Sequence, residues 1–510
     1  MPTRWETFPI EFRGGLISNL SPLQQGINAV GSATILQNFE PSLEGGYKKI
    51  MGFSKYIAGA IPGSDDILGV KVVNGTKVIA ARKNASNVTR YYINVGAAWS
   101  TIATASALGG TVRGTDFNFD GTHRIFFVDG VNSPGVFEDD TDTMTFPAGY
   151  PADVVGAQYV AQFKNAIFVA KGRNLIFSAP FSYTDFSAAS GGGTINIAHE
   201  ITGIIAFREQ LIVFSRNKIV RLVGNTIADF QLQPIAEDIG CIDGDSIQEV
   251  GGDIMFLAPD GLRTLSATER IGDFGLDVAS KAIKKDIDRF TTLSNSFCSV
   301  VLREKAQYRI FGYITSEQKE AAKGIIGTKF VDQGGTGFSW AETKGIKARV
   351  ADSRYTALGE VIVFANNDGY VYRLEQTNGF DGADIEAIYQ SPFMPITDPQ
   401  VRKTYHRLTL FVDPDGTFEF SLSIRLDFDS INVIQPNQIT VSTAGTTTFV
   451  YGGSNTVYGA AIYGAILEKE YRNLIIGSGR TFAIRIEDNS INSSFTLDTA
   501  VLEYATNERR

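Results

Sequence analysis

The sequence predicts an all-β protein built around a β-propeller of six or seven blades. A strand–turn–strand unit returns along the chain, in which a buried apolar strand leads through a tight polar turn to a half-buried strand. The centres of the first strands are 47, 42, 45, 42, 55 and 53 residues apart, at Ile79, Phe126, Phe168, Val213, Met255, Ile310 and Val363. Because a four-stranded propeller blade needs about 40–50 residues, these spacings indicate radial repetition.

The composition and the turn residues favour the same class. Glycine accounts for 52 of the 510 residues and apolar residues for 43%, which is typical of a β-rich chain with many turns. Asp-Gly pairs at 120–121, 260–261 and 368–369 predict hairpin turns, because glycine adopts a positive φ without strain. The β-branched strand centres are too short for the helices of a solenoid.

Residues 1–64 precede the repeats and are predicted to form an extended arm. The segment contains the pairs Gly14-Gly15 and Gly45-Gly46 and lacks the pattern of a blade. We expect contacts with another part of an assembly to hold this arm. Its aromatic residues, with three tyrosines of a later Gly-Tyr-rich segment, are candidate assembly contacts, because such surfaces favour docking. These candidates are Phe8, Phe12 (next to Glu11), Phe39, Tyr47, Tyr451, Tyr458 and Tyr463.

Residues 65–390 hold the repeats, and one inserted helix is predicted near 276–290. Apolar residues recur there at helical spacing, at Leu276, Ala279, Ile283 and Ile287. Lysines occupy the other face of this helix. A structural insertion that covers a blade is the first interpretation. A basic helix that faces DNA is the alternative, although Asp286 and Asp288 dilute its charge.

Residues 391–510 are predicted to form a β-sandwich domain, with a proline-rich linker at its start. The stretch 418–428 alternates apolar and polar residues without a break, which is typical of antiparallel sheet with one buried face. The stretch 413–419 allows two interpretations, a Ca²⁺ loop or a hairpin turn between two strands. The Gly-Tyr-rich segment 450–464 is either a docking surface or a packed loop.

The sequence shows no constellation of catalytic, cofactor-binding or metal-binding residues. No two of His123, His199 and His406 have metal-ligand spacing. His123 precedes a predicted strand, so we expect a role at a turn or strand edge. Cys241 and Cys298 are expected to be small buried side chains rather than nucleophiles. We therefore predict that the protein is not an enzyme and has no cofactor.

The charge balance is acidic, with 46 basic against 55 acidic residues and a net charge of −9. A protein that grips DNA usually carries a basic stripe, so DNA, as a partner, is expected to slide past rather than be held. The N-terminal residues lack the apolar stretch of a signal peptide. No run of about 18 apolar residues predicts a membrane span. These features favour synthesis in the cytoplasm.

Two stretches carry a resemblance to a known family. The first runs from Gly14-Gly-Leu16 through Asn38-Phe-Glu-Pro41 to Gly45-Gly-Tyr-Lys-Lys-Ile-Met-Gly-Phe53, and the second is Val250–Leu265 with Ile271-Gly-Asp-Phe274 after it. In this order they resemble the tail hub or nozzle protein of short-tailed bacteriophages. This is the packaged-DNA stabilisation protein family, which is related to the longer tail tubular protein B. The resemblance covers most of residues 1–390.

The resemblance implies a structural virion protein of a phage tail. It implies a homohexamer, a ring of six subunits below the portal and its adaptor, that extends and closes the channel for viral double-stranded DNA. It also implies attachment surfaces for tail fibres, spikes or a needle, and synthesis in the host bacterial cytoplasm. Two other classes stay open. One is a carbohydrate-binding or glycan-cleaving β-propeller, whose cleaving form needs paired carboxylates. The other is a cellular propeller that serves as a protein-interaction scaffold.

Overall fold

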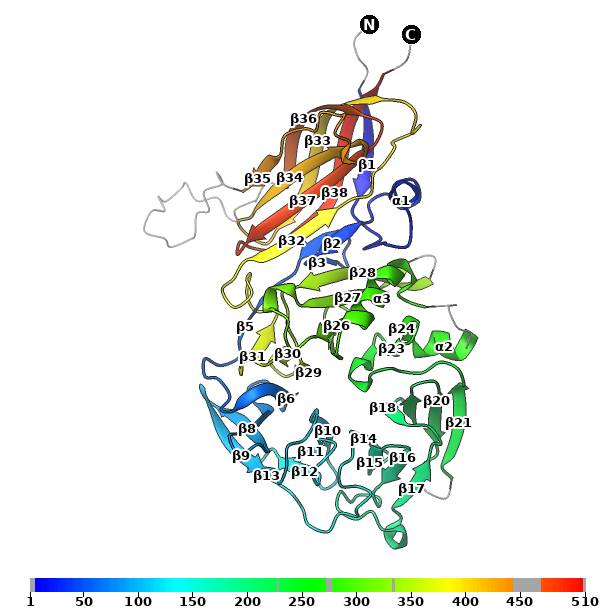
Figure 1. Cartoon of the computed structure of the whole chain (residues 1–510), viewed down its shortest axis with the longest axis vertical. Helices are drawn as coiled ribbons and strands as arrows, with labels where there is room; N and C mark the ends of the chain where they lie inside the picture. Colours follow the sequence, from blue (N-terminus) through cyan, green and yellow to red (C-terminus); the bar gives the residue numbers. More distant parts are fainter. Residues whose placement is uncertain (1–4, 227–228, 272–277, 333–334, 444–468, 508–510) are drawn as a thin grey trace. The chain divides into compact units, whose positions relative to one another are not determined.

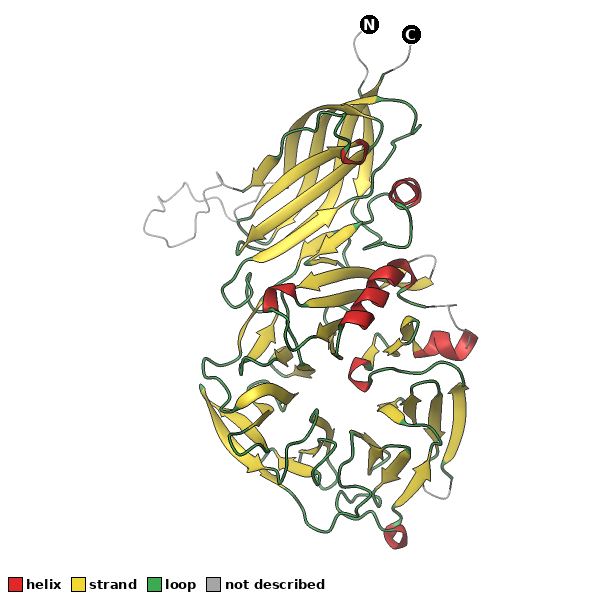
Figure 2. Cartoon of the chain, in the orientation of Figure 1, coloured by secondary structure: helices red, strands yellow, loops and turns green. Residues whose placement is uncertain are grey.

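The computed structural model describes residues 5–226, 229–271, 278–332, 335–443 and 469–507. Strands make up 51% of the chain and helices 8%, and Figure 2 shows few helices among many short strands. The predicted all-β class is therefore confirmed. Within the described ranges, no helix has both the length and the apolar character needed to cross a membrane.

Two compact units divide the chain. Unit 1 consists of Met1–Phe53, Ser339–Lys344 and Glu375–Arg510, and unit 2 consists of Ser54–Phe338 and Gly345–Leu374. The sequence predicted divisions after residues 64 and 390. The contacts of the folded chain instead group residues 1–53 with the C-terminal residues.

Unit 2 is a succession of small antiparallel sheets. The first sheet holds β6 (Ser64–Val72), β7 (Val78–Lys83), β8 (Thr89–Val95) and β9 (Ala98–Thr104). The second holds β10 (Arg113–Phe117), β11 (Arg124–Val128), β12 (Gly135–Glu138) and β13 (Thr143–Thr145). The third holds β14 (Tyr159–Phe163), β15 (Ala166–Lys171), β16 (Asn174–Phe177) and β17 (Gly193–Asn196).

Four further sheets follow along the chain. The fourth holds β18 (Ile201–Phe207), β19 (Gln210–Ser215), β20 (Ile219–Val223) and β21 (Gln231–Ala236). The fifth holds β22 (Gln248–Val250), β23 (Asp253–Ala258) and β24 (Gly261–Thr264). The sixth is formed by β25 (Ser296–Leu302), β26 (Gln307–Tyr313) and β27 (Lys323–Asp332), the first strands in the order of a nine-stranded sheet. The seventh holds β29 (Val350–Thr356), β30 (Gly359–Ala365), β31 (Val371–Leu374) and β5 (Phe53–Lys55).

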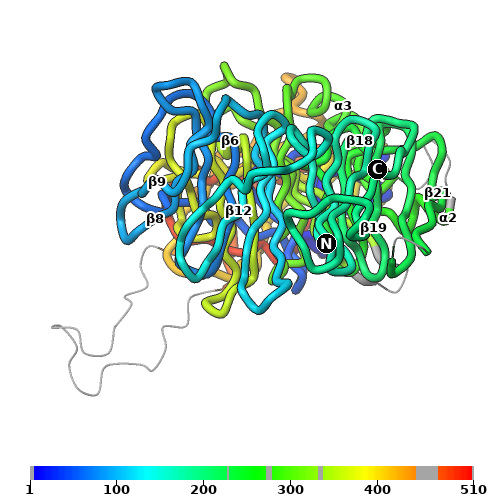
Figure 3. The backbone as a smooth tube through the Cα atoms, turned by 90° about the horizontal axis from the view of Figure 1, so that it is seen from below, coloured from blue at the N-terminus to red at the C-terminus, as the bar shows by residue number. Residues whose placement is uncertain are grey.

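The first strands of these sheets lie side by side in a closed order. The contacts run from β6 to β10, β14 and β18, then through the short helix η2 (Gly244–Ser246) to β25 and β29, and from β29 back to β6. Figure 1 shows the sheets following one another around a circle, and Figures 1 and 3 place β9 and β21 on opposite sides of unit 2. The first strands of six sheets are therefore inner strands of this circle, and η2, just before β22, takes the inner place at the fifth sheet.

The core of unit 2 lies between neighbouring sheets. One cluster joins Phe168 and Phe177 of the third sheet to Leu211 and Val213 of the fourth. Similar clusters join the first sheet to the second and to the seventh, the second to the third, and the fourth to the fifth. Because each sheet buries both faces against its neighbours, its central strand is apolar on both sides.

The predicted repeat is confirmed at the level of strands. Every predicted centre, from Ile79 to Val363, lies in the second strand of one of the seven sheets. The three Asp-Gly pairs lie in turns between paired strands, and Gly121, Gly261 and Gly369 all have positive φ.

The helices of unit 2 depart from the prediction of one insertion. Helix α3 (Lys284–Leu293) follows the 3-10 turn η3 (Lys281–Ile283), and it buries Ile287 and Phe290. Its predicted start at Leu276 lies outside the described residues. A second helix, α2 (Leu265–Ile271), begins where the sequence predicted the end of a strand. The apolar run ended in Thr264-Leu265, and this run alone does not distinguish strand from helix.

Unit 1 contains two antiparallel sheets. The order of one is β3 (Phe39–Pro41), β4 (Tyr47–Lys49), β38 (Phe495–Thr506), β33 (Lys403–Pro414) and β36 (Glu470–Gly479), with β1 (Glu6–Glu11) also on β38. The other contains β2 (Ile35–Gln37), β32 (Ile385–Gln390), β37 (Phe482–Ser490), β34 (Glu419–Leu426) and β35 (Ile439–Ser442). Residues 339–344 of β28 (Gly335–Lys344) also belong to unit 1, where Glu342 pairs with Gln37.

Aromatic side chains pack between the two sheets of unit 1. The ring centroids of Phe420 on β34 and Phe495 on β38 are 5.1 Å apart, and those of Tyr405 on β33 and Phe482 on β37 are also 5.1 Å apart. The alternation at 418–426 therefore forms a buried face, as predicted, whereas Phe428 at the end of the predicted stretch is 48% exposed in the 3-10 helix η5 (Asp427–Asp429). The turn after Pro414 does not join a hairpin, because β33 and β34 belong to different sheets.

The predicted arm is part of the fold of unit 1. Strand β1 pairs antiparallel with β38, in a register that sets Phe8 opposite Leu502. A short helix, α1 (Pro22–Asn28), interrupts the segment, and Ser21 and Gln24 form a capping box at its start. The expectation that the arm needs contacts outside its own chain is therefore wrong for these strands, because C-terminal strands supply their hydrogen bonds.

Candidate functional site

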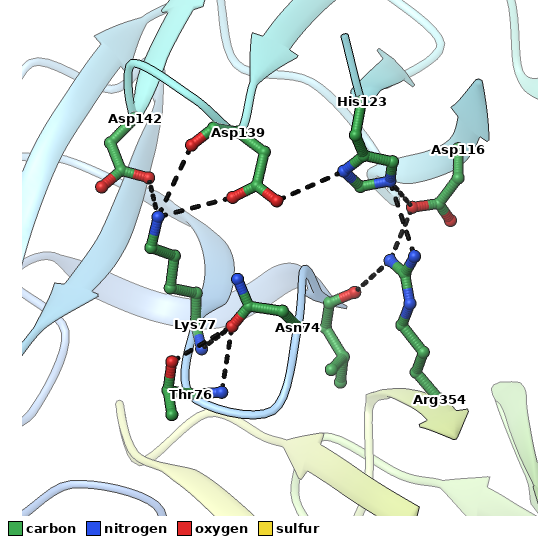
Figure 4. A network of polar contacts seen from close by, with 9 residues as sticks. Asn74, Thr76, Lys77, Asp116, His123, Asp139, Asp142 and Arg354 are labelled. Carbon is green, nitrogen blue, oxygen red and sulfur yellow. Dashed lines mark hydrogen bonds and ion pairs between the residues drawn. The ribbon is translucent and has the colours of Figure 1, made fainter. Parts of the chain in front are cut away.

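The turn between β6 and β7 builds one side of a polar cluster in unit 2 (Figure 4). The Asn74 side-chain oxygen accepts hydrogen bonds from the backbone N–H groups of Thr76 and Lys77, each at 3.0 Å. Asparagine favours such turns because its side chain replaces a backbone acceptor. This arrangement directs Lys77 towards Asp142 and Asp139, with Nζ–Oδ1 distances of 2.7 and 3.4 Å.

His123 lies between two carboxylates, just before β11. Its Nε2 is 2.9 Å from Asp116 on β10, and its Nδ1 is 3.4 Å from Asp139 after β12. Only the protonated ring carries N–H groups on both nitrogens. The hydrogen bond with Asp116 raises the pKa of His123. The cluster therefore favours the imidazolium form.

Asp116 connects three sheets. Arg354 on β29 donates to Asp116 at 2.7 Å and to the backbone oxygen of Val72 on β6 at 3.3 Å. Burial acts to raise the pKa of Asp116, but the hydrogen bond from His123 and the charges of Lys71 and Arg354 outweigh it and hold the pKa well below its usual range. Asp116 is therefore a fixed anion that joins the first, second and seventh sheets.

The same network continues to the inner strands. Lys71 on β6 is 3.5 Å from Asp116 and 3.4 Å from Asp352 on β29. Asp352 also accepts the backbone N–H of Val72 at 2.8 Å. Both residues line a cavity of about 180 Å³ between the inner strands. The charges there are paired across the contact between the first and last sheets.

A second ion pair crosses this inner cavity. Arg113 on β10 donates to both carboxylate oxygens of Asp245 in η2, at 2.6 and 2.7 Å. Such bidentate pairs fix geometry as well as charge. Cys298 also lines the cavity, and burial raises the pKa of its thiol. These residues hold the inner strands together and offer no activated nucleophile.

Sequence reasoning placed His123 at a strand edge but missed the cluster. Asp116, His123 and Arg354 are brought together although Arg354 is 238 positions from Asp116. The only local signal was the charge of residues that flank predicted strands. His199 is exposed, and His406 stacks on Trp5 in unit 1 at 4.4 Å between ring centroids. The described residues hold no group of three metal-ligating side chains.

The candidate assembly contacts occupy different environments. Phe12, Phe39 and Tyr47 are buried in the core of unit 1, whereas Phe8 is half-buried. The Tyr47 hydroxyl donates to the Gly31 carbonyl at 2.8 Å and accepts the Gly15 N–H at 3.0 Å. This burial argues against a surface role for the first three aromatics. Tyr451, Tyr458 and Tyr463 lie outside the described residues.

Comparisons with known proteins identify no family for the chain. No family model and no curated protein matches the chain. A solved structure of the extracellular domain of the one-component system BT4673 from B. thetaiotaomicron is similar, with 11% identity, a TM-score of 0.40, and 72% of this chain and 44% of that chain covered. The extracellular domain of the hybrid two-component system BT3049 from the same organism has 11% identity, a TM-score of 0.37 and coverage of 61% and 40%. This chain spans less than half of those chains, and likenesses this distant support no function.

Proposed function

We propose that the chain is a structural subunit of the tail of a short-tailed bacteriophage, the hub or nozzle that extends the DNA channel. In this proposal unit 2 is a seven-bladed β-propeller and unit 1 a β-sandwich. The closed order of inner strands supports the propeller, as does β5, an early strand that completes the last sheet. In propellers, radial repetition leaves only short, protected sheet edges.

The observation that carries the proposal is that the charged side chains of the inner cavity are paired with one another. A propeller enzyme would hold its reacting groups in such a cavity. Asp245 is bound by Arg113, and Asp352 is bound by Lys71. A glycan-cleaving site needs a carboxylic acid with a raised pKa that is free to give up its proton. In the inner cavity burial raises the pKa of Asp352, but the Lys71 ammonium and the Val72 N–H occupy its two carboxylate oxygens. This network suits a rigid platform.

The partners follow from the family resemblance of residues 14–53 and 250–265. The chain forms a homohexamer below an adaptor, and viral double-stranded DNA passes through the ring. The net charge of −9 favours passage of the DNA, because every contact of a Lys or Arg side chain with a DNA phosphate would strengthen the adhesion of the DNA to the ring. Tail fibres, spikes or a needle attach to the ring, and its location is the virion tail.

The test is assembly on the purified portal–adaptor complex of the phage that encodes the chain. Mass photometry of the mixture is expected to show the portal–adaptor mass increased by six copies of the chain. A chain that stays monomeric in the mixture contradicts the proposal. A mixture with an unrelated portal–adaptor complex is the control for non-specific association.

A further inference from the structure

A cavity of about 500 Å³ opens on the polar cluster of unit 2. The turn between β6 and β7 contributes Asn74 and Gly75, and His123 and Asp139 come from the second sheet. The turn between β29 and β30 contributes Tyr355 and Leu358. Its volume lies within the range of about 300–1,000 Å³ that small-molecule sites occupy. We propose that this cavity binds the pyranose ring of a neutral sugar, a function separate from tail assembly.

The charges that line the cavity favour a neutral ligand. Asp139 is compensated by Lys77 and His123, and Arg354 by Asp116. A bound cation or anion would have to compete with these internal partners. A sugar hydroxyl both donates and accepts hydrogen bonds. A neutral sugar can therefore form hydrogen bonds with both the donors and the acceptors of the cavity, and its binding leaves the net charge of the site unchanged.

The other wall of the cavity is apolar and exposed. Tyr355 is 60% exposed and Leu358 is 70% exposed, although both are large apolar side chains. The tight turn that carries them is fixed by the hydrogen bond from Leu358 N–H to the Thr356 hydroxyl at 3.2 Å and by the positive φ of Gly359. An aromatic face beside polar groups suits a pyranose ring, which has an apolar C–H face and a polar rim.

Gly75 allows the two turns to approach each other. A Cβ atom at this position would lie 2.9 Å from Leu358 Cδ1 and 3.1 Å from Thr356 Oγ1. A larger residue would therefore push the Leu358 side chain away from the β6–β7 turn. Gly75 therefore limits the distance between the apolar side of the cavity, at Leu358, and the polar side, at Asn74.

The site is suited to binding a sugar and releasing it unchanged. Cleavage of a glycosidic bond needs one carboxyl that donates a proton and a second that acts as base or nucleophile. Asp139 is the carboxylate among the lining residues, and Lys77 and His123 engage it.

The test uses the full chain and saturation-transfer NMR with glucose, galactose, mannose and N-acetylglucosamine, each titrated separately. At least one is expected to bind with a dissociation constant on the order of 1 mM. Tyr355→Ala is expected to weaken that binding about tenfold, since it removes the aromatic face. Tyr355→Phe keeps the ring and is expected to bind as the wild type does.

Phe181→Ala is the matched control, because Phe181 is 64% exposed in unit 2 and lies outside the cavity lining. Circular dichroism confirms that each variant is folded. The proposal is overturned when none of the four sugars binds, or when Tyr355→Ala binds as tightly as Phe181→Ala. Tighter binding of inorganic phosphate in competition with the sugar also overturns it. Assembly on the portal–adaptor complex is measured separately, so the two proposals fail independently.

Discussion

Replacing Asp116 with Asn is expected to weaken the joint between the first, second and seventh sheets. Asp116 accepts from His123 Nε2 at 2.9 Å and from Arg354 at 2.7 Å, and Lys71 lies 3.5 Å away. A hydrogen bond to a charged group contributes about 1.5–3 kcal/mol. The side chain is 33% exposed, and Asn keeps one acceptor oxygen. We therefore expect a loss of about 2–3 kcal/mol after discounting for solvent screening.

The same substitution is expected to change the pH dependence of stability. Because the pKa of His123 is raised in the folded protein, the stability that His123 contributes is complete below its unfolded pKa of about 6.5. This stability is lost as the pH rises through the folded pKa of His123. The lowered pKa of Asp116 affects stability at acidic pH, because the stability that Asp116 contributes is lost as the pH falls below the ordinary carboxyl range. Asp116→Asn should flatten the decline above pH 6.5.

Calorimetric melting of the full chain measures both effects. A loss of about 2–3 kcal/mol is expected to lower the affected transition by roughly 5 °C. Asp140→Asn is the control, because Asp140 is an exposed carboxylate next to Asp139. Equal melting temperatures for the two variants, or an unchanged pH profile in Asp116→Asn, would refute the account of this cluster.

Two further predictions concern unit 1. Lys49→Met should cost about 3–5 kcal/mol in chemical denaturation, because it removes the cation that lies 2.8 Å from the buried Asp488 carboxylate. The double variant Lys49→Met, Asp488→Leu should recover most of this loss. A double variant no more stable than Lys49→Met would count against the pairing. Ser21→Ala should cost about 1 kcal/mol by removing the cap of α1, whereas Ser42→Ala, outside any helix, should leave the denaturation midpoint nearly unchanged.

Local pattern was sufficient for the strands and hairpins of unit 2. Buried strands such as 167–170 and 211–214 are short and apolar, and Asp-Gly turns separate several of them from their partners. These signals act over a few residues, so they are readable without knowledge of the fold. The class and the repeat could be predicted for this reason.

Partners distant in the sequence could not be predicted. Strand β1 pairs with β38 at the other end of the chain, and no local pattern in residues 6–11 specifies that partner. The aromatics Phe12, Phe39 and Tyr47 looked like surface contacts because their segment is rich in glycine, but they are buried in unit 1. Asp116 and Arg354 meet only through closure of the sheets. The capping box at Ser21 was readable, and it was missed because α1 is only seven residues long.

Cryo-electron microscopy of the chain assembled on its portal–adaptor complex tests the central claim most directly. We expect six copies around a continuous channel, with the seven-sheet unit recognisable in each copy. Density for one copy per complex, for a ring of another number, or for no bound chain would contradict the assignment as a tail hub.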